Sequence, residues 1–132
     1  MSGLRALQEA LAAEHAAVYG YGVAGAHLSG GRQAMARQLW LAHMQARDTL
    51  TAMIRASGGT PVATQAFYEL PFPVHDAASA LQLAAHLEDG VTAAYLAVVA
   101  TEQRMFGAVA MQVAAGRAAT WRGTTIAFPG LP

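Results

Sequence analysis

The stretch GGTPVATQAFYELPFPVH, residues 58–75, decides how the rest of the chain is arranged. It contains Pro61, Pro71 and Pro73, has no helical period, and is longer than most connections inside compact domains. A connection of this length can run the full height of a helix bundle, whereas a turn between adjacent antiparallel helices needs only a few residues. The helices before and after it are therefore expected to be parallel.

Amphipathic segments flank this crossover. Before it, residues 33–57 have an apolar face that includes His43, and the run Gly58-Gly59-Thr60-Pro61 ends this predicted helix. After it, Asp76 is a candidate N-cap for a helix over residues 76–100, in which Glu88 interrupts the apolar face. Each of these two helices is therefore expected to bring a polar side chain to the core.

Two further helices are predicted outside this pair. Residues 3–29 have apolar side chains at helical spacing, interrupted by Glu14, and Ser29-Gly30-Gly31 ends the helix. Thr101 is a candidate cap for a shorter helix over residues 102–120, and residues 121–132 are expected to form an extended tail lying on the bundle. The chain is thus predicted to be one all-α domain of four helices covering residues 1–132.

A short turn, a long crossover and a second short turn form the connectivity of ferritin-like four-helix bundles, which simple up-and-down bundles lack. Several stretches also carry a resemblance: residues 7–25 with the core AEHAAVYGYG, residues 42–48, LPFP at 70–73, LED at 87–89, and the segment from Trp121-Arg122-Gly123 to Phe128-Pro129-Gly130. In these the chain resembles an uncharacterised ferritin-like family common in high-GC bacteria, a domain of unknown function. The resemblance implies the fold and a dimer, and it brings no known activity.

The composition disfavours several classes of function. Eight basic and eight acidic side chains cancel, so neither nucleic acid nor an anionic membrane is expected as a partner. With no cysteine there is no disulfide framework and no thiolate site, which suits a cytoplasmic protein. No signal peptide is expected, and the longest weakly charged stretch, residues 16–31, is shorter than the roughly 20 apolar residues of a membrane span. Because 55% of the residues are hydrophobic, a homodimer is expected to cover surplus apolar surface.

The carboxylates on the apolar faces raise the question of a metal centre. A di-iron bundle needs a glutamate from each of two helices and a Glu-x-x-His pair from each of the other two. Glu14 and Glu88 fit the single-glutamate positions, but Trp40 stands three residues before His43, and the fourth helix offers only the surroundings of Ala114 at the matching depth. The pattern indicates a degenerate di-iron site. A mononuclear site for iron or another divalent metal, built from Glu14, His43 and Glu88, is the alternative.

Without a metal, the buried carboxylates need other partners, because an unpaired buried carboxylate is costly. If the second helix runs back antiparallel to the first from a turn near Gly30, Glu14 lies opposite Ala46, which is next to Arg47. An ion pair between Glu14 and Arg47 is therefore predicted. Glu88 is expected to complete the buried network with His43, His15 or a tyrosine. The candidate tyrosines are Tyr19 and Tyr95.

Small and aromatic residues near the first turn have no assigned role. Gly20, Gly22 and Gly25 lower helix propensity by roughly 1 kcal/mol each relative to alanine, which calls for a physical reason. Close approach of another helix, from this chain or from a dimer mate, is the favoured reason, and a ligand slot is the alternative. Trp40, with Leu41 and Met44, lies off the main apolar stripe and is expected to cover the crossover, to form a dimer contact or to join the core.

Three functions remain for this sequence. The first is a non-catalytic structural or interaction module without a cofactor, in which a buried polar network fills the ancestral metal position. The second is a metal-binding, iron-linked oxidoreductase using Glu14, His43 and Glu88. The third is a small-molecule binder. No phosphate-binding loop and no nucleophilic triad supports any other enzyme class.

Overall fold

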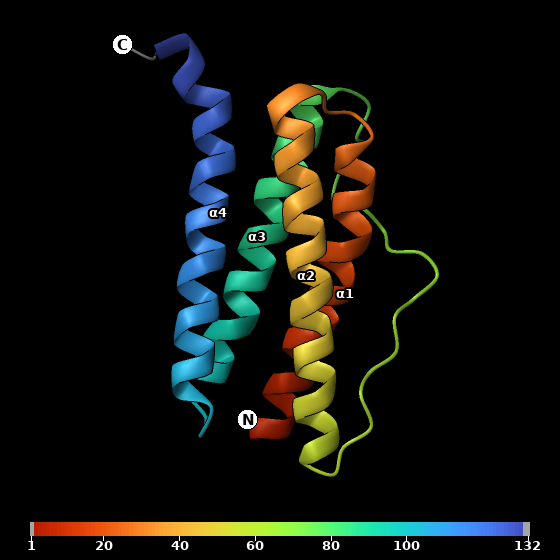
Figure 1. Cartoon of the computed structure of the whole chain (residues 1–132), viewed down its shortest axis with the longest axis vertical. Helices are drawn as coiled ribbons and strands as arrows, with labels where there is room; N and C mark the ends of the chain where they lie inside the picture. Colours follow the sequence, from red (N-terminus) through yellow and green to blue (C-terminus); the bar gives the residue numbers. More distant parts are fainter. Residues whose placement is uncertain (1, 131–132) are drawn as a thin grey trace.

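Four helices make up most of the structure. The computed structural model describes the backbone of residues 2–130 and the side chains of residues 2–123. Helix α1 spans Gly3–Gly25, α2 spans Gly30–Ala56, α3 spans Ala77–Val99 and α4 spans Arg104–Gly130. The predicted all-α four-helix bundle is confirmed (Figure 1).

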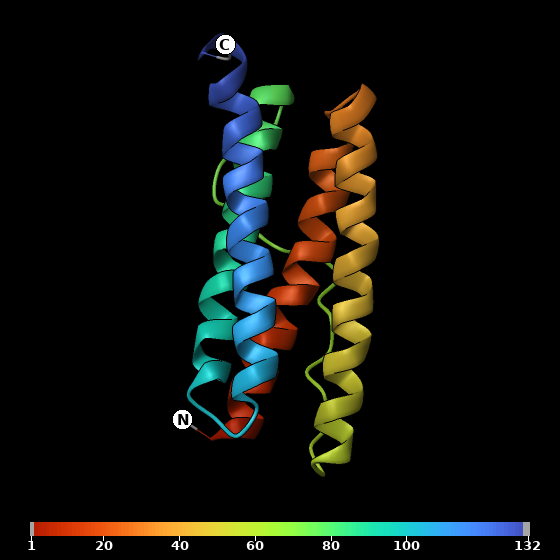
Figure 2. The same ribbon diagram turned by 60° about the vertical axis from the view of Figure 1, so that its left-hand side comes forward.

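The order of the helices follows from the long connection between α2 and α3. In Figures 1 and 2, α1 and α4 run in one direction and α2 and α3 in the other, and the segment after α2 returns along the whole length of the bundle. The expected parallel arrangement of α2 and α3 is therefore present. Helix α1 packs against both α2 and α3, and α4 packs against α3.

The crossover is held against the outer side of α1 by hydrogen bonds and ring contacts. The Gln8 side chain donates to Thr60 O at 2.6 Å and accepts from Val62 N at 2.8 Å. His15 Nε2 lies 3.0 Å from the carbonyl oxygen of Val62. The Tyr19 ring packs on two crossover aromatic rings, those of Phe67 and Tyr68. These contacts fix the path of a segment that has no helix or strand of its own.

The first turn lies earlier in the chain than the sequence suggested. Helix α1 ends at Gly25, not near residue 29, and α2 begins at Gly30, not near residue 33. The amide groups of His27 and Leu28 bond the carbonyl groups three residues before them and tighten the chain immediately after α1. Gly30 has a φ of 59°, in the left-handed region that glycine adopts without a side-chain clash. The turn is consequently centred between Gly25 and Gly30.

The expected tail is wrong, because α4 continues to Gly130 instead of ending near Thr120. Buried side chains at Ala114, Ala118 and Trp121 recur at spacings of four and three residues, so they form one helical face against the core. The Arg122 guanidinium also makes two hydrogen bonds to the Asp89 carboxylate of α3, which lower the pKa of that carboxyl group. Both contacts favour a continued helix. Residues 131–132 of the expected tail lie outside the described residues.

Close helix packing explains one of the α1 glycines. A Cβ atom on Gly20 would lie 2.5 Å from Leu87 Cδ1, so the absence of a side chain lets α1 and α3 approach. A Cβ atom on Gly22 would meet nothing within 4 Å. Close packing against Leu87 therefore explains why residue 20 is a glycine. No contact within the described residues explains why residue 22 is a glycine.

Candidate functional site

A cluster of polar and aromatic side chains lies at the centre of the bundle, and all four helices contribute to it. Each member is at most 2% exposed. The members are Glu14 and Tyr21 from α1, His43 from α2, Glu88 and Tyr95 from α3, and Trp121 from α4. We call this set the core network.

The imidazole of His43 bridges the two carboxylates. Its Nδ1 atom is hydrogen-bonded to Glu14 Oε1, and its Nε2 atom lies 2.8 Å from Glu88 Oε2. Carboxylate oxygens are acceptors only, so a ring that satisfies both of them must donate from both nitrogens. That requirement defines the imidazolium form of His43, with one positive charge between two negative charges.

Aromatic donors complete most of the remaining hydrogen bonds. The Tyr95 hydroxyl donates to Glu14 Oε2 at 2.7 Å, and the Tyr21 hydroxyl donates to Glu88 Oε2. Trp121 Nε1 in turn donates to the Tyr21 hydroxyl oxygen at 2.8 Å. The Tyr21 ring is stacked on His43, with ring centroids 5.3 Å apart. The network is therefore a continuous chain of hydrogen bonds from α4 through α1, α3 and α2.

One carboxylate oxygen is not engaged. Among the described residues, Glu88 Oε1 is a buried side-chain oxygen without a hydrogen bond. Two carboxylates facing one imidazolium also leave a negative charge that His43 does not balance. The half-buried Arg117 of α4 adds a positive charge that acts on both phenol groups, lowering their pKa values. The negative charge of the carboxylates raises the pKa values of His43, Tyr21 and Tyr95.

The surroundings raise the pKa values of His43, Tyr21 and Tyr95, so these groups stay protonated at neutral pH. Burial alone would lower the pKa of His43, but the hydrogen bonds and charges of Glu14 and Glu88 outweigh it and raise that pKa from 6.5 to about 9. Burial, reinforced by the neighbouring carboxylate, raises the pKa of Tyr21 and of Tyr95 far above its ordinary value. At neutral pH His43 is charged and both phenols are protonated donors.

A pH dependence of stability follows from His43. The pKa of the folded protein is higher than the 6.5 of the unfolded chain, so the stabilisation is complete below pH 6.5 and is lost as the pH rises through about 9. We expect the free energy of unfolding to fall by about 3 kcal/mol over that window, as measured by urea unfolding at a series of pH values. The tyrosines do not contribute there, because their ordinary pKa of 10.0 is raised further.

The control for this titration is a His43→Gln variant, whose glutamine cannot ionise. Its free energy of unfolding should be lower at neutral pH and should change much less over the same window. A wild-type protein whose stability stays constant from pH 6.5 to about 9 would contradict the bridging imidazolium.

The structure brings Glu14, His43 and Glu88 together, and it places the other two predicted members elsewhere. The predicted Glu14 to Arg47 ion pair is wrong, since Arg47 Nε lies 3.1 Å from Asp48 Oδ1 and both Glu14 oxygens are bonded within the core network. The earlier turn is the reason, because it moves the residue opposite Glu14 from the neighbourhood of Arg47 toward His43. His15 is bonded to the crossover backbone instead.

Sequence reasoning misses two members of the network and misassigns a third. Tyr21 lies on the apolar stripe of α1, but nothing in that stripe identifies it as the partner of Glu88. Trp121 falls in the expected tail, although its spacing from Ala114 and Ala118 is a signal for a continued helix. Tyr95 is a candidate partner of Glu88 and bonds Glu14 instead, whereas Tyr19 packs on the crossover.

The donor set does not fit a two-metal centre. Within the described residues, no group of three or more histidine, cysteine, aspartate or glutamate side chains is arranged to hold a metal ion. Both nitrogens of His43 face carboxylate oxygens, so neither nitrogen is free to bind a metal in this arrangement. Trp40 precedes His43 by three residues, and α4 presents Ala114, Ala118 and Trp121 to the core. The described side chains therefore lack the Glu-x-x-His pairs that a di-iron bundle uses.

No helix in the described part of the chain is long and apolar enough to cross a lipid bilayer.

The helix order and the core network define a class: a four-helix bundle with a long crossover, whose core is closed by hydrogen bonds between side chains of all four helices. The chain belongs to the family Domain of unknown function (DUF4439), whose model matches residues 6–132. It is similar to a conserved hypothetical protein, rv2844, from Mycobacterium tuberculosis, known from a crystal structure. The identity is 34%, the match covers 92% of this chain and 96% of that chain, and the TM-score is 0.88. No curated protein matches the chain. The expected membership of an uncharacterised family is confirmed.

Proposed function

We propose that this protein is a non-catalytic ferritin-like bundle, an interaction module in which a hydrogen-bonded core network stands in place of a di-iron centre. The observation that supports the proposal is the bridging position of His43. Its two ring nitrogens are both engaged by Glu14 and Glu88, so the residues that could bind a metal are bound to one another. No reactive group of the network is left at a surface where a substrate could reach it.

The network has a physical role in such a module. A buried polar group without its partner costs free energy, so only the packing that completes these hydrogen bonds is favoured. His43 of α2, Glu88 of α3 and Trp121 of α4 are joined through Tyr21 and Glu14 of α1. The network thereby fixes the rotation and the height of the helices relative to one another. A bundle fixed in this way presents a constant outer surface to a partner.

The competing function is a metal-binding, iron-linked oxidoreductase. It is favoured by one observation, the unengaged Oε1 atom of Glu88, which offers a buried carboxylate oxygen. Carboxylate oxygens and imidazole nitrogens are ligands that iron and other divalent metals accept. In that case the protein should contain metal after purification, and the metal should depend on the carboxylates.

Metal content distinguishes the two functions. The untagged protein is expressed in medium supplemented with iron and zinc and compared with a Glu14→Gln, Glu88→Gln double variant. We expect far less than one equivalent of metal in both proteins, because the side chains engage one another. Stoichiometric metal in the wild-type protein that is lost in the double variant would overturn the proposal and favour the oxidoreductase.

We also propose that the module is a homodimer that pairs through α4. Met105, Val109 and Val113 lie four residues apart on this helix and are 74%, 58% and 45% exposed. No charged residue occurs between Arg104 and Arg117. An exposed apolar stripe without charges is typical of the centre of a protein interface.

Light scattering coupled to size-exclusion chromatography tests the dimer. We expect a dimer for the wild-type protein and a monomer for a Val109→Glu, Val113→Glu variant, because two buried carboxylates would have no partners. Leu41→Glu on α2 is the matched control, since Leu41 is also exposed, at 49%, and lies on another helix. A monomeric wild-type protein would contradict the dimer, and dissociation by Leu41→Glu alone would place the interface on α2.

A further inference from the structure

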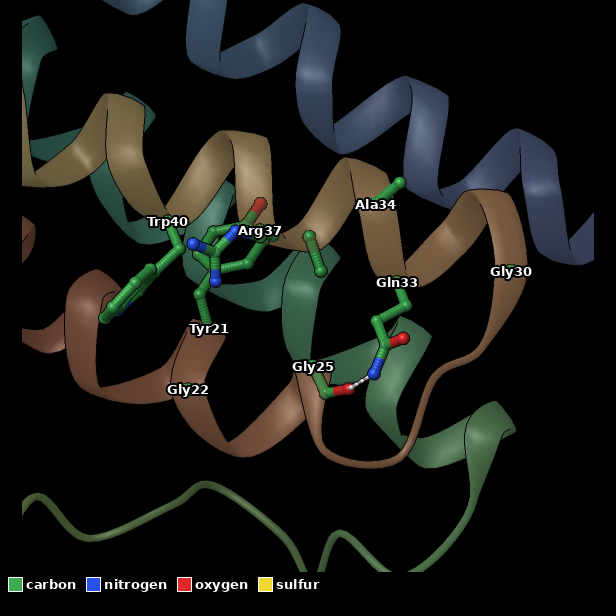
Figure 3. Close-up of a pocket in the computed structure, with 9 residues that line it drawn as sticks. Tyr21, Gly22, Gly25, Gly30, Gln33, Ala34, Arg37 and Trp40 are labelled. Atoms are coloured by element: carbon green, nitrogen blue, oxygen red, sulfur yellow. Dashed lines mark hydrogen bonds between the residues drawn. The ribbon is translucent and has the colours of Figure 1, made fainter.

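A hollow of about 520 Å³ lies between α1 and α2, near the turn that joins them. Its volume falls within the range of small-molecule sites. Tyr21, Gly22 and Gly25 line it from α1, and Gln33, Arg37 and Trp40 line it from α2. Figure 3 shows the side chains of Arg37 and Trp40 extending from α2 toward α1, beside Tyr21. The Gln33 side chain crosses the end of the hollow and donates to Gly25 O at 3.4 Å.

Arg37 gives the hollow a positive charge that is not neutralised. Arg5, Arg47 and Arg122 each have a carboxylate partner within 4 Å. Arg37 is exposed at the rim of the hollow and has no hydrogen bond or ion pair with the described side chains, and no acidic residue lines the hollow. A guanidinium group with free donors in a fork geometry binds a carboxylate by two parallel hydrogen bonds.

Two aromatic rings provide flat apolar surface beside this charge. Trp40 is half-buried, and its indole borders the hollow. Tyr21 also borders it, while its own hydroxyl is turned into the core network, where it is bonded to Glu88 and Trp121. Aromatic rings of this kind pack against planar groups with a preference for offset or edge contacts.

The glycines of α1 keep the hollow open at a cost. Glycine in the middle of a helix is less favourable than alanine by roughly 1 kcal/mol. Gly20 has a reason for its missing side chain, because Leu87 occupies the space beside it. A Cβ atom added to Gly22 would have no neighbour within 4 Å, and one added to Gly25 would lie 3.9 Å from Ala36 Cβ. Gly22 is exposed and lines the hollow, so the missing side chain leaves open space there that a ligand can occupy.

We propose that this hollow binds a small monocarboxylate with a planar apolar body, such as an aromatic carboxylic acid. Arg37 holds the carboxylate, and the planar body lies over Gly22 between Trp40 and Tyr21. A single arginine matches one negative charge, which favours a carboxylate over a doubly charged phosphate. The hollow shares Tyr21 with the core network but includes none of Glu14, His43 and Glu88, so ligand binding there is tested independently of metal binding.

Isothermal titration calorimetry with 2-naphthoate tests the proposal, and 2-naphthamide is the neutral analogue of the same shape. We expect saturable one-to-one binding of 2-naphthoate, with an affinity at least about tenfold higher than that of the amide. Tryptophan fluorescence should change on binding, since Trp40 borders the hollow. No binding of 2-naphthoate at millimolar concentration, or equal binding of the amide, would overturn the proposal. Inorganic phosphate that binds more tightly than 2-naphthoate would also overturn it.

Variants of α1 and α2 locate the site. Arg37→Gln should weaken 2-naphthoate binding at least about tenfold, whereas Arg55→Gln, a change at an exposed arginine of the same helix, should leave it unchanged. Gly22→Ala fills part of the hollow and also favours the helix, so it should weaken binding without lowering the thermal unfolding temperature. Equal effects of the two arginine variants, or full affinity in Gly22→Ala, would overturn the proposal. So would a dimer that dissociates in Gly22→Ala, which would make the hollow a subunit contact.

Discussion

The His43→Ala variant is expected to lose about 3–5 kcal/mol of its free energy of unfolding at neutral pH. The substitution removes the positive charge between Glu14 and Glu88 and leaves both carboxylates buried without it. Burial of an uncompensated charge costs far more than the loss of one hydrogen bond. Urea unfolding followed by circular dichroism measures the change.

The matched control is His27→Ala, the same substitution at an exposed histidine, which should change the free energy of unfolding by no more than about 0.5 kcal/mol. A second comparison separates charge from packing. In a Glu14→Gln, Glu88→Gln background the carboxylates are gone, so His43→Ala should cost markedly less than in the wild-type protein. An equal cost in both backgrounds would show that His43 contributes through packing alone.

Trp121→Ala is expected to lower the free energy of unfolding by about 3–5 kcal/mol, because it empties the space of a fully buried indole. The same change removes the donor to the Tyr21 hydroxyl. Trp121→Phe keeps most of the packing and removes the N–H group, so it should cost only about 1 kcal/mol. Thermal and urea unfolding of the two variants measure the difference.

Trp40→Ala is the control for Trp121, because Trp40 is half-buried at the edge of the bundle and should cost less. The result also decides how α4 ends. If Trp121→Ala changed the stability by less than about 0.5 kcal/mol, residues beyond Thr120 would not pack against the core, and the extended tail expected from the sequence would be the better description.

The order of the helices could be predicted from the sequence because it depends on the lengths of the connections and on turn residues, which can be recognised locally. The length of the 58–75 segment and its prolines set the parallel pair α2 and α3, and Gly30 and Gly58 adopt the positive φ angles that turns require. The end of α4 could not be predicted in this way. It depends on burial of Trp121 between helices, which is a tertiary contact that overrides the glycine and proline signals near the C-terminus.

The core network was predictable in part. Glu14 and Glu88 each interrupt an apolar stripe, which indicates burial and therefore a partner. The identity of the partners depends on the relative height of the helices, and a shift of the first turn by a few residues was enough to replace Arg47 by His43. Hydrogen bonds such as those of Tyr95 with Glu14 and of Trp121 with Tyr21 join residues far apart in the chain. The spacing of residues within one helix cannot predict such contacts between helices.

The same network explains how a helix bundle can hold two carboxylates in its core. An isolated carboxylate in the core would be neutralised or would destabilise the fold. Here His43 supplies a positive charge to both carboxylates, and the tyrosines supply hydroxyl donors. Loss of single members is therefore expected to be more harmful than joint replacement of the whole set by neutral side chains.

The protonation state of His43 tests the hydrogen-bonded core most directly. A long-range proton–nitrogen correlation spectrum of protein labelled with nitrogen-15 histidine shows which ring nitrogens are protonated, and His43→Gln assigns the signals of this residue. We expect both nitrogens of His43 to be protonated at neutral pH, with one transition near the pKa of about 9. A neutral His43 at neutral pH, with one ring nitrogen lacking a proton, would contradict the bridging imidazolium. It would favour a role of His43 as a metal ligand instead.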